Sequence, residues 1–169
     1  MILIFKHKKP SIHKSCFIAE NSTIIGAVTI EESSSIWYNA VVRADVNNIY
    51  IGKGTNIQDN CTLHVNHNSP LSIGEYVTVG HNAILHGCTI GNNVLIGMGS
   101  IIMDDVEIGD NTIIGAGSLV SPGKTIPSGV LCLGSPAKII RQLKPNEIKN
   151  LSLSANNYIE AAFTYKTSQ

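Results

Sequence analysis

A six-residue repeat of aliphatic side chains constrains the fold of this chain more than any other feature. An Ile or Val occupies every sixth position from Ile12 to Val42, and the pattern runs on to Ile126 with a few short changes of spacing. An α-helix has a period of about 3.6 residues and a strand a period of about 2, so neither produces this pattern. The repeat therefore predicts a structure in which the chain turns at regular, short intervals.

Hexapeptide repeats of this kind form a parallel β-helix. Each repeat supplies one short strand and one corner, and three repeats make a triangular coil of about 18 residues. The aliphatic side chains point inward and stack on those of neighbouring coils, so the core is buried only when the coils stack. Glycine or Asn is expected at the corners, where a positive φ is often needed. We predict a mainly β fold over residues 1–143, with a cap at its N-terminal end.

The repeat fades around Pro136, and a helical pattern follows it. Pro145 suits the first turn of a helix, and Glu147 favours the positive end of the helix dipole. Apolar residues then recur at helical spacing, namely Ile148, Leu151, Ala155, Tyr158, Ile159 and Ala162. Residues 144–169 are therefore predicted to form a C-terminal α-helix that packs on the β-helix.

Composition narrows the functional classes. The chain has 12 basic and 12 acidic residues, so no overall charge favours nucleic acid or an anionic membrane. Only 14% of residues are charged and 43% are apolar, which indicates that part of the surface is buried against other subunits. No apolar run approaches the roughly 20 residues of a membrane span, and the opening MILIF is too short for a signal peptide. We expect a cytoplasmic protein.

The repeat also places polar residues relative to one another. Counting forward from Val42 assigns each aliphatic to one of three prism faces, named a, b and c in chain order. Arg43, His64 and His86 each directly follow an aliphatic of face a, so they stack on successive coils about 4.8 Å apart. Histidine is the commonest metal ligand. His64 and His86 are therefore predicted to lie close enough to share one metal ion.

A third histidine falls on a different face. His81 lies two residues after an aliphatic of face c, and Asp59 occupies the equivalent position one coil earlier. A straight prism keeps His81 away from His64 and His86 within one chain. A threefold axis that sets face a of one subunit against face c of the next brings the three together. We therefore predict a homotrimer with one metal site at each interface.

The segments NIQDNCTLH and VGHNAILHGC, preceded by VVRAD, resemble those of the γ-class carbonic anhydrases, and the similarity spans nearly the whole chain. The hexapeptide proteins as a group imply a left-handed coil. The resemblance to the carbonic anhydrases implies that His64, His81 and His86 bind Zn²⁺, with Fe²⁺ or Co²⁺ as alternatives. It also implies that Arg43 pairs with Asp45 at the trimer interface. The remaining residues implied at the site are Gln58, Asp59 and, from the C-terminal helix, Tyr158.

This ligand set predicts the reaction. Three neutral imidazoles leave one position of a tetrahedral Zn²⁺ open, and the metal lowers the pKa of its water to about 7. The resulting hydroxide attacks CO₂ to give bicarbonate. We expect the Gln58 amide to orient the hydroxide or the substrate, and Asp59 to fix the tautomer of a histidine.

Two positions depart from the family pattern. Where well-studied members carry glutamates for proton transfer, this chain has Val46 and His67. Val46 cannot transfer protons. His67 lies in the inserted VNHNSP loop and has a suitable unperturbed pKa, so it is either a replacement shuttle or an exposed loop histidine.

Three other functions remain open at this stage. A coenzyme-A-dependent acyltransferase would use a histidine as general base without a metal. The GSPAK segment, residues 134–138, also ends many hexapeptide acyltransferases near coenzyme A, although it is equally explained as the exit from the β-helix. A metal-dependent thioesterase would direct the same hydroxide at an acyl-CoA. In a non-catalytic scaffold, the metal would only hold the trimer together.

Overall fold

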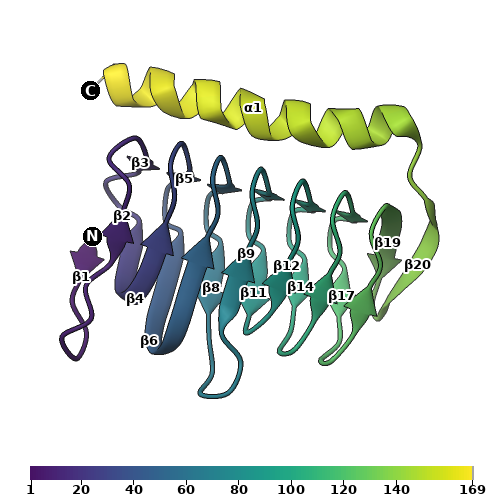
Figure 1. Ribbon diagram of the computed structural model, residues 1–169, viewed down its shortest axis with the longest axis horizontal. Helices are drawn as coiled ribbons and strands as arrows, with labels where there is room; N and C mark the ends of the chain where they lie inside the picture. The colour runs from purple at the N-terminus through teal and green to yellow at the C-terminus, as the bar shows by residue number, and fades with distance from the viewer. Residues whose placement is uncertain (169) are drawn as a thin grey trace.

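The computed structural model describes residues 1–168 and shows a left-handed parallel β-helix with one long helix along its side (Figure 1). A twelve-stranded sheet forms faces a and b, and an eight-stranded sheet forms face c. Face a consists of β6 (Val41–Ile51), which continues onto face b, and of β8 (Thr62–His64), β11 (Ile84–His86), β14 (Ile101–Ile102) and β17 (Leu119–Val120). Face b consists of β9 (Leu71–Ile73), β12 (Thr89–Ile90), β15 (Glu107–Ile108) and β18 (Thr125–Ile126).

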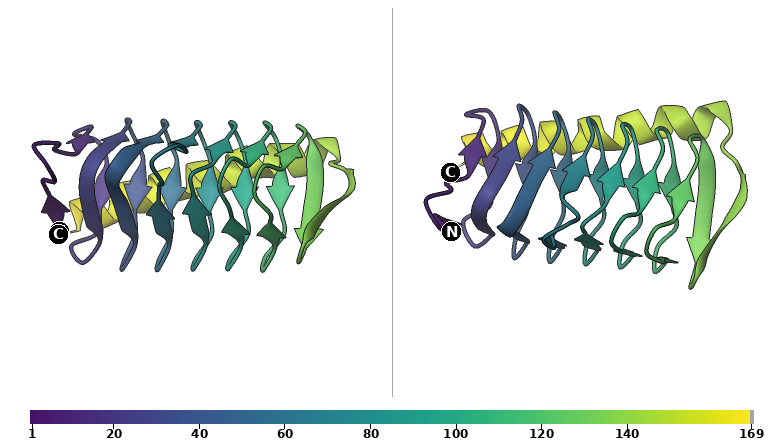
Figure 2. Two further views of the ribbon diagram at one scale, coloured as in Figure 1. Left: turned by 90° about the horizontal axis from the view of Figure 1, so that it is seen from below. Right: turned by 60° about the horizontal axis from the view of Figure 1, so that its bottom comes forward.

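Face c consists of β3 (Phe17–Ile18), β5 (Ser35–Ile36), β7 (Asn56–Ile57), β10 (Thr78–Val79), β13 (Leu95–Ile96), β16 (Ile113–Ile114) and β19 (Val130–Gly134). At the N-terminal end, β1 (Ile2–Leu3) and β2 (Ser11–Ile12) both pair with β4 (Thr23–Ile30), which in turn pairs with β6. Figure 2 shows the coils stacked along the long axis of the molecule.

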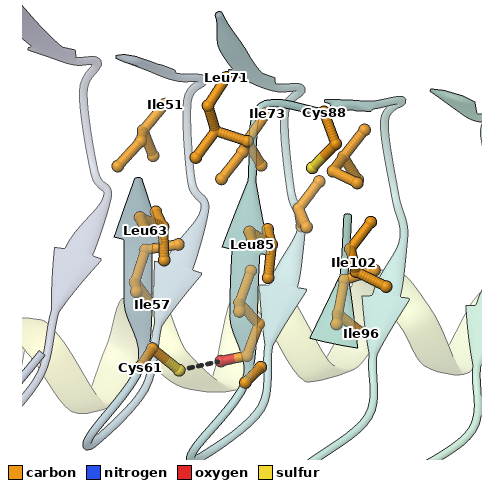
Figure 3. Packing of buried hydrophobic residues seen from close by; sticks show 14 of the residues in the cluster. Ile51, Ile57, Cys61, Leu63, Leu71, Ile73, Leu85, Cys88, Ile96 and Ile102 are labelled. Atoms are coloured by element: carbon orange, nitrogen blue, oxygen red, sulfur yellow. Dashed lines mark hydrogen bonds between the residues drawn. The ribbon is translucent and has the colours of Figure 1, made fainter. Parts of the chain in front are cut away.

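The strand registers agree with the face count made from the sequence. On face a, Leu63 pairs with Val42 on one side and Leu85 on the other. On face c, Ile57 pairs with Val79 in parallel register. Leu63, Leu85 and Ile57 are fully buried and point into the prism, as Figure 3 shows. The predicted inward columns of aliphatic side chains are confirmed.

The corners differ in part from the expectation. Asn60 and Asn82 stack at one corner with φ of 59° and 60°, so asparagine does supply the positive φ there. The glycines that follow the aliphatics have another role. A Cβ on Gly74 would lie 2.6 Å from the carbonyl oxygen of Gly91 in the next coil, although Gly74 has no positive φ. These glycines therefore allow two coils to approach closely.

The buried columns predict a large loss of stability on truncation. Ile73 is fully buried on face b, so Ile73→Ala should lower the free energy of unfolding by about 2–5 kcal/mol through lost burial and a residual cavity. Guanidinium denaturation at fixed protein concentration measures this change. Ser72→Ala, on the same strand but partly exposed, is the matched control and should change stability by about 0.5 kcal/mol or less. Equal effects of the two substitutions would contradict the packing argument.

The C-terminal end contains one element that the repeat does not predict. β19 and β20 (Ala137–Gln142) form an antiparallel hairpin that closes the prism. Helix α1 (Pro145–Thr167) then runs back along the prism, as predicted, and contacts β3, β5, β7 and β10 on face c (Figure 1). Nothing in residues 1–168 tests the division into units at residue 143, which stays a prediction.

Polar contacts anchor both ends of α1. Arg141 donates two hydrogen bonds to Glu147, and together with the backbone N–H of Lys144 they lower the pKa of Glu147 to about 2. At the other end, Lys166 donates to the carbonyl oxygen of Lys14 at 2.6 Å. Helix α1 is not apolar enough to cross a membrane, and it is the only helix found in residues 1–168. The cytoplasmic location stays a prediction.

Candidate metal centre

A chain of polar side chains crosses face a over four coils. The registers align Arg43 with His64 and His64 with His86. Arg43 forms an ion pair with Asp45, and Asp45 Oδ1 accepts a hydrogen bond from His64 Nε2 at 3.0 Å. His64 Nδ1 then lies 2.9 Å from His86 Nε2. At the far end, His86 Nδ1 donates to Asp104 Oδ1 at 2.6 Å.

The two carboxylates determine which nitrogens of these rings carry protons. An ionised carboxylate only accepts hydrogen bonds, so Asp45 holds the proton of neutral His64 on Nε2, and Asp104 holds that of His86 on Nδ1. Burial opposes ionisation of Asp45, but hydrogen bonds from His64 and Arg43 outweigh it and lower its pKa. The two nitrogens that face each other at 2.9 Å then both present lone pairs.

Face c carries the third histidine, again with a carboxylate behind it. His81 Nδ1 lies 2.7 Å from Asp59 Oδ2, and the other oxygen of Asp59 accepts from the backbone N–H of Tyr38. The expected contact between Asp59 and His81 is therefore present. The Nε2 atom of a neutral His81 is left with a lone pair, and about a third of this side chain is exposed, at 37%.

Gln58 joins His81 to an apolar groove. Its Oε1 accepts from the backbone N–H of His81 at 3.2 Å, and its Nε2 donates to Asn56 at 3.1 Å. Beside them lies a groove of about 410 Å³, which includes Leu95, Ile113 and, from α1, Ser154. The amide that the sequence predicts at the site is thus buried and held in place, at one end of an apolar surface.

Tyr158 comes from α1 and lies near this region without a hydrogen bond to the histidines. Its ring packs edge-on against Trp37, with centroids 5.5 Å apart. Burial and the negative charge of Asp59 raise the pKa of the Tyr158 hydroxyl, which places it near that carboxylate. His67 lies in an exposed loop, and its own backbone carbonyl oxygen accepts a hydrogen bond from the Asn47 side chain at 3.1 Å. The proton-transfer role of His67 stays a prediction.

One chain does not assemble the complete set. Within residues 1–168, no three His, Cys, Asp or Glu side chains converge closely enough to hold a metal ion. His64 and His86 belong to strands of face a, whereas His81 follows β10 on face c. The single chain therefore presents two of the predicted ligands on one face and the third on another.

Sequence reasoning missed Asp104. Ile102 pairs with Leu85, so it belongs to face a, and Asp104 follows it by two positions. The face count puts Met103 level with His86 and Asp104 level with Gly87, so it does not predict the contact between Asp104 and His86. The repeat thus gives the coil that carries Asp104 but not its partner, and the histidine motif does not extend to this residue.

Known proteins share both the repeat and the fold of this chain. Residues 70–102 and 87–122 match the family model of the bacterial transferase hexapeptide, which consists of six repeats. A crystal structure of a Bacillus cereus protein described as an acetyltransferase is similar over 100% of this chain and 98% of that one, with a TM-score of 0.98 and 50% identity. The fold is thus shared almost completely.

Several curated relatives with similar sequences are named carbonic anhydrases, which is more specific than the hexapeptide family. A carbonic anhydrase of Geobacillus kaustophilus is 50% identical over 169 residues, which cover 100% of this chain and 93% of that protein. The mitochondrial gamma carbonic anhydrase 2 of Arabidopsis thaliana is 45% identical over 92% of this chain, but the chain spans only 58% of the plant protein. From its repeats, its histidine pattern and these relatives, the chain belongs to the γ-class carbonic anhydrase family.

Proposed function

We propose that this protein is a metal-dependent carbonic anhydrase, which interconverts CO₂ and bicarbonate at sites shared between the subunits of a homotrimer. The observation that carries the proposal is the approach of two carboxylate-backed imidazoles. His64 Nδ1 and His86 Nε2 face each other at 2.9 Å with their lone pairs. Two acceptors repel at this distance unless a proton or a cation lies between them.

The donor set fits a small divalent cation. The 2.9 Å between the two nitrogens is near the roughly 3.3 Å that separates two ligands of a tetrahedral zinc with bonds of about 2.0–2.1 Å. Metal-bound histidines usually donate their other ring N–H to a carboxylate, as Asp45, Asp59 and Asp104 allow here. We infer that His64 and His86 of one subunit and His81 of the next hold Zn²⁺, or else Fe²⁺ or Co²⁺.

The bound cation supplies an acidic water with a pKa near 7, and hence a nucleophile at neutral pH. The protein orients the ligands and the substrate around it. Asp45 and Asp59 hold the rings of His64 and His81 in one tautomer. Gln58 is buried beside His81, where its amide can orient a small oxygen-containing substrate. The adjoining apolar groove offers apolar CO₂ a surface to contact next to His81.

Exposed aliphatic side chains support the trimer. On face a, Ile84 pairs in register with Ile101, and their side chains point outward from the coil. On face c, Leu95 and Ile113 line the groove next to His81. Apolar rows on the same two faces as the histidines suit burial against another subunit. A threefold contact of face a with face c would cover both rows and unite the three histidines, with the Arg43–Asp45 pair at the boundary.

Relatives in the family favour hydration of CO₂ over the other reactions. Two curated bacterial and archaeal relatives, at 50% and 46% identity, are named carbonic anhydrase and probable carbonic anhydrase. Acyl transfer is the second candidate, because the similar Bacillus cereus structure is described as an acetyltransferase. An acyl group would have to occupy the apolar groove next to His81.

Stopped-flow CO₂ hydration tests the proposal. Protein reconstituted anaerobically with Zn²⁺, Fe²⁺ or Co²⁺ should be active, whereas His81→Ala should lose about three orders of magnitude or more, because the metal loses a ligand. His13→Ala, an exposed histidine at the N-terminal end, is the matched control and should retain full activity. Inactive wild-type protein with full metal occupancy would contradict the reaction. Turnover of acetyl-CoA by metal-free protein would favour acyl transfer.

A further inference from the structure

We propose that Asp104 is a positioning residue, which orients His86 for metal binding from a recess that glycine at position 87 keeps open. The inference rests on the proposed metal site, but it concerns how one ligand is held and not which reaction follows. Neither the repeat nor the histidine motif identifies Asp104, and its place is visible only in the folded chain.

The contact itself determines the state of the ring. Asp104 Oδ1 lies 2.6 Å from His86 Nδ1, and the aspartate side chain is 29% exposed. Because an ionised carboxylate accepts and does not donate, it keeps the proton on Nδ1 and the lone pair on Nε2. That lone pair faces His64. Without Asp104, the ring is free to adopt the other tautomer or to rotate away from His64.

Gly87 provides the space for this carboxylate. Its φ is +52°, and a Cβ at this position would lie 2.3 Å from Asp104 Oδ1 and 2.8 Å from the side chain of Ser69. A side chain at position 87 would therefore force the carboxylate away from His86. The recess thus requires glycine for two reasons, the backbone conformation and the approach of Asp104.

The neighbouring carboxylate has a different partner. Asp105 accepts a hydrogen bond from Ser69 Oγ at 2.6 Å, and the histidine–carboxylate pairs found in residues 1–168 involve Asp45, Asp59 and Asp104 instead. Asp105 also has a φ of 59°, a conformation that asparagine adopts as readily as aspartate. The two adjacent aspartates therefore have different partners, a histidine for Asp104 and a serine for Asp105. Aspartate-to-asparagine substitution removes one charge at either position, but only at Asp104 does it remove the contact that orients the His86 ring.

The experiment compares Zn²⁺ affinity in full-length Asp104→Asn, Gly87→Ala, Asp105→Asn and wild-type protein, by competition with a chromophoric chelator. An amide can donate as well as accept, so Asp104→Asn no longer selects one tautomer. We expect about 10–100-fold weaker Zn²⁺ binding for Asp104→Asn and Gly87→Ala, and no change for Asp105→Asn. The visible absorption of Co²⁺-loaded protein should change in the first two variants only.

The outcomes separate the two levels of inference. If wild-type protein binds Zn²⁺ and Asp104→Asn binds it within about twofold of wild type, the positioning role is wrong and the metal site stands. If wild-type protein binds neither Zn²⁺ nor Co²⁺, the proposed metal site fails and this inference fails with it. Should Gly87→Ala not fold, as circular dichroism would reveal, the Asp104→Asn and Asp105→Asn pair still decides the question.

Discussion

Mixing His64→Ala chains with His81→Ala chains should restore metal binding and CO₂ hydration, although each variant alone has neither. His64 and His86 lie together on face a and His81 on face c, so a shared site takes its ligands from two chains. In a mixed trimer, a His81→Ala chain can supply face a with its intact His64 and His86. When a His64→Ala chain supplies face c of the same site, with its intact His81, that site has all three histidines. Random assembly of a cyclic trimer from equal amounts restores about one quarter of the wild-type sites.

The matched control is a mixture of His64→Ala with His86→Ala. These two histidines come from the same chain, with ring nitrogens 2.9 Å apart, so every site in any mixed trimer lacks one of them. Co-expression with two different affinity tags allows mixed trimers to be purified. Their metal content and stopped-flow rate then measure the restored sites.

Each result has a distinct meaning. Restoration in the first mixture and none in the control establishes that the site is shared. No restoration in either, from purified mixed trimers, would contradict the assignment of His81 to the neighbouring subunit. Equal restoration in both would contradict the pairing of His64 with His86 in one site.

The repeat predicts most of the fold because each of its positions has one physical role. An aliphatic that must point inward at every sixth residue determines the faces, and the registers Val42–Leu63–Leu85 and Ile57–Val79 follow from counting. The stacking of Arg43, His64 and His86 needs no further information, because residues that follow paired aliphatics are themselves paired.

The repeat fails where its spacing ends. After Ile126 the six-residue step is kept once more at Cys132, which is buried and pairs with Ile114, but the antiparallel β19–β20 hairpin that begins there has no periodic signal. Glycine is expected at corners for its positive φ, as at Gly99 and Gly117, but Gly74 instead allows a close approach of two coils. Sequence shows that a side chain is absent, but not which atoms occupy the space.

The sequence could place the three histidines on their faces, but not all of the groups around them. Asp59 was expected beside His81 because both follow a face-c aliphatic by two residues, and they do lie in contact. Asp104 follows its face-a aliphatic by two residues whereas His86 follows its own by one, so counting does not pair them, although they lie in contact. The groove beside His81 depends on the sizes of side chains from α1 as well as the coils, and no spacing rule predicts it.

A lysine on the outer row of face a should separate the subunits without unfolding them. Ile101 lies on β14 between Ile84 and Leu119, its side chain points outward, and it is 37% exposed in the single chain. Within one prism, Ile101→Lys therefore leaves the core unchanged, and the long side chain can reach solvent. In the proposed trimer, however, it would bury an unpaired charge, at a cost of about 3–5 kcal/mol for each interface.

The matched control introduces a lysine on the face that the proposed trimer leaves free. Tyr50 lies on the face-b part of β6, is 41% exposed, and has Glu31 and Glu75 nearby to accept a cation. Sedimentation equilibrium should give the mass of one chain, 18.1 kDa, for Ile101→Lys and three times that mass for Tyr50→Lys and wild type. Because His81 would then lack its partners, Ile101→Lys should also lose metal and activity. A trimeric, metal-loaded Ile101→Lys protein would show that face a does not form the interface.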